Sequence, residues 1–187
     1  MSNNTVVLAI CAGVAAMAAA PAYAQTAPKP AAAAKPAATS PASRTPANVG
    51  QLMKGIIYPA SNVVFAAQND NPNDIKPAKD PSTATDPLQS AYGRWEAVEN
   101  AALAMSEAAS LLTIPGRKCA NGRMAPIANA DWAKFVRDLR AVGLKVYAAA
   151  QTKDHDKILD AADAMTTTCA NCHDKYREKP TLAERCK

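Results

Sequence analysis

Residues 158–176 read ILDAADAMTTTCANCHDKY. Apolar residues recur in this stretch at steps of three and four, which is the period of one buried face of a helix. They are Ile158, Ala162, Met165, Cys169, Cys172 and Tyr176. The pattern stops before Pro180, which cannot continue a helix. The stretch therefore predicts a long amphipathic helix close to the C-terminus, and this helix carries the motif Cys-Ala-Asn-Cys-His at residues 169–173.

This motif is the sequence pattern of covalent haem attachment. The thiols of Cys169 and Cys172 can bond the two vinyl groups of one haem, while the imidazole of His173 reaches the iron. A redox disulfide and half of a zinc site are the alternatives. A redox pair would normally begin a helix in a fold with strands, and zinc would need four ligands, for which only His155 and two distant cysteines remain. The motif predicts one covalently attached haem c, with His173 as an axial ligand of its iron.

Three other segments have the same helical period. The first follows Thr45-Pro46, which supplies an N-cap and a proline at the first helical position, and the second follows Asp86-Pro87. The apolar positions are Val49, Met53, Ile56, Ala60, Val63 and Ala67 in the first segment; Leu88, Ala91, Trp95, Val98, Ala102, Met105, Ala109 and Leu112 in the second; and Trp132, Phe135, Leu139, Val142, Val146 and Ala149 in the third. Pro59 is expected to bend the first helix. The prediction is an all-α fold, an antiparallel up-down-up-down four-helix bundle with the haem on its C-terminal helix.

The N-terminal part of the chain has a different composition. Residues 5–24 are apolar and small and end in Ala-Tyr-Ala, the form that a signal peptidase cleaves, so we expect residues 1–24 to be a signal peptide. A membrane anchor is the alternative, and membrane association is expected only if this segment is not cleaved. Residues 25–48 are rich in Ala and Pro and are predicted to form a disordered tether, which leaves residues 49–187 as the cytochrome domain. The expected location is the periplasm.

The charge argues against a nucleic-acid partner. The formal net charge is +5, and Lys29, Lys35 and Arg44 in the predicted tether account for three of it. The remainder carries only +2, so most of the basic excess lies in the predicted tether, where no aromatic residues are interleaved with it. We therefore predict no binding to nucleic acid.

The position of the Cys-Ala-Asn-Cys-His motif near the C-terminus is typical of one family of haem proteins. A haem motif on the last helix of a four-helix pattern, with Arg177 one turn after the histidine and Leu52-Met53-Lys54 early in the first helix, resembles the class II c-type cytochromes, the cytochrome c-prime and cytochrome c-556 family. The resemblance covers residues 45–179. It implies a left-handed four-helix bundle in the periplasm that holds the haem between its helices and is not an enzyme, and many members form homodimers. Redox partner proteins are the expected partners.

Members of this family have one of two functions, and the sixth ligand of the iron decides which. In the c-556 type a methionine of the first helix fills that position and the protein transfers electrons, whereas the c-prime type has a five-coordinate iron that binds small gases such as NO and CO. In an up-down-up-down bundle Met53 and His173 would both lie roughly 10 Å from the same end, at 1.5 Å per residue. Met53 is therefore the predicted sixth ligand, and an open iron that Met53 merely covers is the alternative.

Three further residues have predicted roles. Arg177 is a candidate contact of a haem propionate, with a solvated surface arginine as the alternative. Cys119 and Cys186 are not used by the haem and fall at the same end of the predicted bundle, so we expect a disulfide between them in an exported protein. Two free thiols, or an intermolecular bridge through Cys186, are the alternatives.

Overall fold

The computed structural model describes residues 45–186, and their regular secondary structure is helical. The elements are α1 (Val49–Leu52), a π-helical turn (Met53–Ile57), α2 (Tyr58–Asn69), α3 (Arg94–Ala108) with a 3₁₀ turn at its end (Ala109–Thr113), α4 (Ala130–Gln151) and α5 (His155–Tyr176). Two more 3₁₀ turns, Pro81–Thr83 and Pro87–Gln89, lie between α2 and α3. The described residues contain no β-strand, only an isolated bridge between Lys118 and Met124. The predicted all-α class is confirmed.

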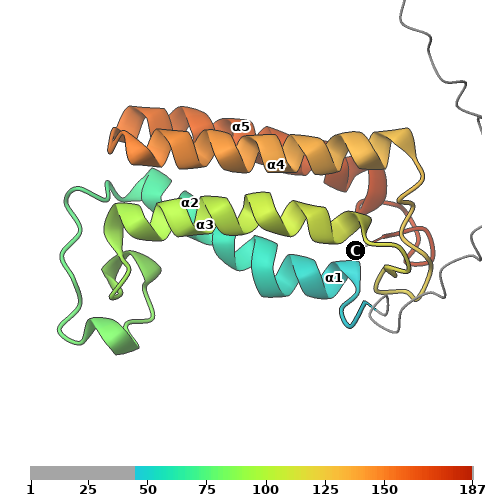
Figure 1. Cartoon of the computed structure of the whole chain (residues 1–187), viewed down its shortest axis with the longest axis horizontal. Coiled ribbons are helices and arrows are strands. Elements are labelled where there is room, and N and C mark those ends of the chain that lie inside the picture. Colours follow the sequence, from blue (N-terminus) through green and yellow to red (C-terminus); the bar gives the residue numbers. More distant parts are fainter. Residues whose placement is uncertain (1–44, 187) are drawn as a thin grey trace, which may run out of the picture. The chain divides into compact units, whose positions relative to one another are not determined.

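The long helices lie alongside one another (Figure 1), and the contacts between them form a closed ring. α2 packs against α3, α3 against α4, α4 against α5, and α2 contacts α5 to complete the ring. The centre of the ring is filled by side chains from all four, among them Val64, Val98, Met105, Val146, Ile158 and Met165, which are fully buried. α3 and α4 approach closely at Gly143, where a Cβ atom would lie 3.0 Å from the Ala102 carbonyl oxygen. This arrangement is compatible with a four-helix bundle.

The first helix begins later than the sequence predicted. Asn48, and not Thr45, is the N-cap: its side chain accepts from the Gln51 N–H at 2.8 Å, and the Gln51 side chain accepts from the Asn48 N–H at 2.9 Å. This reciprocal pair is a capping box, which satisfies two backbone donors at once. Thr45 instead donates its hydroxyl to the Gly116 carbonyl at 3.3 Å. Residues 45–48, assigned to the tether from sequence, are therefore bonded to the domain.

A π-helical turn changes two of the buried positions of the first helix. The Tyr58 N–H bonds to the Met53 carbonyl five residues earlier, directly before Pro59, which lacks a donor of its own. Ile57 and Val64 are buried in place of the predicted Ile56 and Val63, which are only half-buried, whereas Ala60 and Ala67 are buried as predicted. The distortion expected at Pro59 is thus a local π-helical turn, which a uniform helical period could not predict.

The second helix also begins later than predicted. Asp86 caps only the 3₁₀ turn Pro87–Gln89, accepting from the Leu88 N–H at 2.9 Å, and α3 begins at Arg94. Between them Gly93 lies so close to the Leu88 carbonyl that a Cβ atom would be 2.5 Å from that oxygen. The chain therefore turns tightly before α3, and Ala91, predicted on the buried face, is exposed.

Hydrogen bonds join the ends of different helices. The Val49 N–H at the start of α1 donates to the Lys118 carbonyl in the loop after α3, at 2.8 Å. His155 Nε2 at the start of α5 lies 3.0 Å from the Ala67 carbonyl oxygen near the end of α2. Trp132 Nε1 at the start of α4 donates to the Leu112 carbonyl just after α3, at 3.2 Å. These bonds fix which helix ends are neighbours.

The predicted signal peptide and residues 25–44 of the predicted tether lie outside the described residues. Within residues 45–186, no helix has the length and hydropathy needed to cross a membrane.

Candidate haem site

The residues predicted to hold the haem line one cavity. This cavity, called the motif cavity below, has a volume of about 560 Å³ and is lined by Cys169, Cys172 and His173 of α5. Met53 from the π-helical turn and Arg177 at the end of α5 line it as well. The structure therefore brings together all five residues that sequence reasoning assigned to the haem, although Met53 lies 124 positions before Arg177 in the chain.

The helical geometry of α5 places the motif side chains on one face. Cys169 and His173 are four residues apart within the helix, and Cys169 and Cys172 three apart, so their side chains are neighbours on its surface. Burial raises the pKa of both thiols, that of Cys172 to about 11. Burial, and then the positive charge of Arg177, lower the pKa of His173. The imidazole is therefore neutral at pH 7, which is the form that can bind a metal.

The local environment does not suit a redox pair. A reactive C-x-x-C pair needs a thiolate stabilised by a helix N-terminus or a nearby cation. Cys169 and Cys172 instead lie in the C-terminal half of a 22-residue helix, where their pKa values are raised.

The structure distinguishes Met53 from the other methionines of the described region. Met105 on α3 and Met165 on α5 are fully buried in the core and do not line the motif cavity. Met124 is 58% exposed and borders a different, smaller cavity. Met53 is half-buried and faces the motif cavity, so it is the methionine whose thioether can lie across this space from α5.

Three aromatic side chains, Trp132, Phe135 and Tyr176, form one wall of the motif cavity. The sequence predicted only that they lie on buried helix faces. The Trp132 and Tyr176 rings meet edge to face with centroids 4.9 Å apart, and Phe135 and Tyr176 with centroids 6.2 Å apart. The Tyr176 hydroxyl donates to Asp131 Oδ1 at 2.6 Å, and this bond is the main reason that the pKa of Asp131 is lowered. The spacing of Phe135 and Tyr176 on their helices predicted a buried face, but the cavity they enclose depends on how α4 and α5 pack.

Arg177 lies at the cavity but has a partner there. Its Nε atom contacts the Glu178 carboxylate, and the pKa of Glu178 is lowered chiefly by this interaction. Both side chains are about half exposed, so the pair contributes little to stability. The positive charge of Arg177 is thus partly neutralised within the chain itself.

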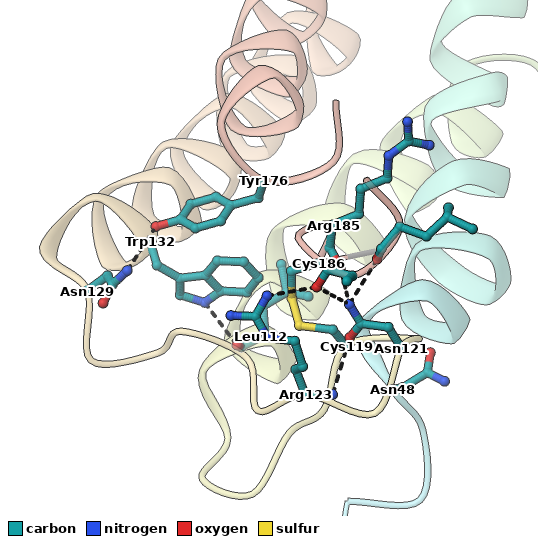
Figure 2. Close-up of a disulfide and its surroundings, with 12 residues drawn as sticks. Asn48, Leu112, Cys119, Asn121, Arg123, Asn129, Trp132, Tyr176, Arg185 and Cys186 are labelled. Atoms are coloured by element: carbon teal, nitrogen blue, oxygen red, sulfur yellow. Dashed lines mark hydrogen bonds between the residues drawn. A yellow bond between two sulfur atoms is a disulfide. The ribbon is translucent and has the colours of Figure 1, made fainter. Parts of the chain in front are cut away.

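The C-terminal segment, residues 177–186, folds back beside the motif cavity (Figure 2). A disulfide joins Cys186 to Cys119, with Cα atoms 4.8 Å apart, which is the pairing expected from sequence. The Asn121 side-chain amide donates to the carbonyls of Leu182, Ala183 and Arg185 at 3.1, 3.0 and 2.8 Å. The Cys186 N–H donates to the Tyr176 carbonyl at 2.8 Å. The segment is therefore attached to the loop after α3 and to the end of α5.

Removing the disulfide is expected to destabilise the domain. The bond closes a loop with a sequence separation of 67 residues, and the chain-entropy model gives roughly 4 kcal/mol for a loop of that size. We expect Cys119→Ala/Cys186→Ala to lower the free energy of unfolding by about that amount in a urea titration, and reduced wild-type protein to match the variant. Air-exposed wild-type protein in which Cys119 and Cys186 both titrate as thiols would refute the pairing.

The motif cavity fits a haem in size and chemistry. Its volume of about 560 Å³ falls within the range of cavities that enclose small ligands. The walls are mainly apolar and include Ile57, Phe65, Leu112, Val136 and Leu139, while two thiols and a neutral imidazole project from one helix. Apolar walls suit a porphyrin ring, thiols suit its vinyl groups and imidazole suits its iron.

Comparisons with known proteins identified no similar protein. No family model, no curated protein and no solved structure matches the chain.

Proposed function

We propose that this chain is a periplasmic mono-haem c-type cytochrome that transfers electrons. The observation that carries the proposal is the motif cavity, where Cys169, Cys172 and His173 face the same space as Met53. When bound there, the haem would supply a one-electron iron couple. The resemblance to class II cytochromes points the same way, and redox partner proteins are the partners that follow from it. We propose no catalytic turnover of a substrate.

Each lining residue has a distinct part in this proposal. Cys169 and Cys172 would hold the haem c through thioether bonds, and His173 would bind the iron through a neutral imidazole. Met53 would provide a thioether as sixth ligand, which favours the ferrous state and raises the potential. The apolar wall formed by Trp132 and Phe135 would exclude water, which also favours the less charged iron.

We further propose that the ring of helices is the antiparallel up-down-up-down bundle expected from sequence. Three pairs of helix ends support it. The end of α2 meets the start of α5 through Ala67 and His155. The start of α4 meets the end of α5 through Asp131 and Tyr176, and the end of α3 meets the start of α4 through Leu112 and Trp132. In each pair, an end bonded to a start indicates neighbours that run in opposite directions.

Absorption spectra of the purified protein in both redox states test the function. With His173 and Met53 as ligands, we expect a low-spin spectrum in both states and no change when carbon monoxide is added to the reduced protein. A high-spin spectrum together with ready binding of carbon monoxide would instead support the gas-binding alternative. A protein without haem bands after periplasmic expression alongside the haem-attachment machinery would refute both functions.

A further inference from the structure

We infer that Arg185, held in place by the disulfide-bonded C-terminal segment, is the principal partner of a haem propionate. This inference rests on the proposed haem site. It transfers to Arg185 the role that sequence reasoning gave to Arg177, and it gives the Cys119–Cys186 disulfide a part in positioning that residue.

The charges around the motif cavity motivate the inference. The charged side chains among its lining residues are Lys54, Arg177, Glu178 and Arg185, so the lining carries a formal net charge of +2. Two propionates carry a charge of −2 when ionised. Because burying uncompensated carboxylates is costly, this excess of positive charge suits the acidic edge of a haem.

The partners of the two arginines differ. Arg177 already contacts the Glu178 carboxylate. Arg185 has no ion pair within residues 45–186, and its one side-chain hydrogen bond runs from Nε to the Lys179 carbonyl, at 2.6 Å. This leaves both terminal nitrogens of the guanidinium available, and they form the planar fork that matches a carboxylate. Lys54 is an exposed lysine, a mobile point charge without that geometry.

The C-terminal segment holds Arg185 from both sides. The backbone carbonyl of Arg185 accepts from Asn121 at 2.8 Å, and the next residue, Cys186, forms the disulfide with Cys119. Figure 2 shows the Arg185 side chain extending away from this disulfide, and the side chain lines the motif cavity. Pre-organisation of this kind lowers the entropy that the arginine loses when it pairs with a carboxylate.

The test is the midpoint potential of the full-length holoprotein, measured by spectroscopic redox titration. An unpaired propionate places negative charge near the iron and favours the ferric state. We expect Arg185→Gln to shift the equilibrium toward the ferric form about threefold, a fall of about 30 mV at 59 mV per tenfold change for one electron. Arg185→Lys, which keeps the charge but not the fork, should show a smaller fall.

Matched variants separate pairing from a general loss of charge. Lys118→Gln removes one positive charge from the same loop as Cys119, at an exposed residue that lines neither cavity, and should change the potential much less. Arg177→Gln should also have the smaller effect. In Cys119→Ala/Cys186→Ala the potential should fall as in Arg185→Gln, and adding Arg185→Gln to that variant should change little more.

Three results would overturn the inference. Equal shifts in Arg185→Gln and Lys118→Gln would show only a general effect of charge. A larger shift in Arg177→Gln would return the role to Arg177. An undiminished effect of Arg185→Gln in the protein without the disulfide would show that the disulfide does not position the residue. A chain that retains no haem after denaturation refutes the proposed function instead, so the two failures are distinguishable.

Discussion

Haem should remain with the chain when the denatured protein is extracted with acidified organic solvent, and Cys169→Ala/Cys172→Ala should abolish this retention completely. The reason is that only thioether bonds survive loss of the fold and of the iron ligands, whereas a haem held by His173 and Met53 alone leaves with the solvent. The measurement is the haem absorbance in the two phases. Changing Cys172 alone should leave one thioether or block maturation.

The second cysteine pair provides a matched control for this experiment. Cys119→Ala/Cys186→Ala removes the same number of sulfur atoms, but from the disulfide instead of the motif, and should retain its haem. Wild-type protein that releases its haem into the solvent would show that the assignment of Cys169 and Cys172 is wrong.

Met53→Ala is expected to convert a closed iron into an open one. Loss of the thioether should abolish the weak near-infrared sulfur-to-iron band of the oxidised protein, lower the midpoint potential and allow the reduced protein to bind carbon monoxide. Because Met53 is half-buried at the wall of a cavity, the substitution should cost less stability than truncation of a core methionine.

Met105→Leu is the control for this variant. It removes a thioether from the core of α3, away from the motif cavity, and keeps the volume of the side chain. We expect the near-infrared band to persist. If the band disappears in Met105→Leu and persists in Met53→Ala, the sixth ligand has been assigned to the wrong helix, although electron transfer would remain the proposed function.

Comparison of the predicted and observed buried positions shows how well the local sequence predicts which face of each helix is buried. In the C-terminal helix the predicted apolar positions are confirmed: Ile158, Ala162 and Met165 are buried, and Cys169, Cys172 and Tyr176 line the motif cavity. In the first helix, Ile57 and Val64 are buried instead of Ile56 and Val63, although Ala60 and Ala67 are buried as predicted. A periodic pattern assumes a constant number of residues per turn, so it cannot predict these two exchanges beside a π-helical turn.

Only the part of the candidate site that lies on a single helix was predicted from the sequence. Cys169, Cys172 and His173 are close in sequence, and the geometry of a single helix is enough to bring them to one face. Trp132 and Arg185 were not assigned to the site, because they reach it through the packing of α4 and through the folding back of the C-terminal segment. Only the cysteine count indicated that this segment returns to the domain.

The sequence by itself determined the helical class, the approximate extent of the four long helices and the placement of the Cys-x-x-Cys-His motif on one helix face, since each of these depends on residues within a few turns of one another. The tertiary structure decided which side chains enclose the motif cavity, that Met53 and no other methionine of residues 45–186 faces it, and that Arg185 lies at its edge. Many of these contacts join residues far apart in the sequence, as in the separation of 67 between Cys119 and Cys186. Such contacts depend on the packing of whole helices against one another, which the hydrophobic period of a single helix does not predict.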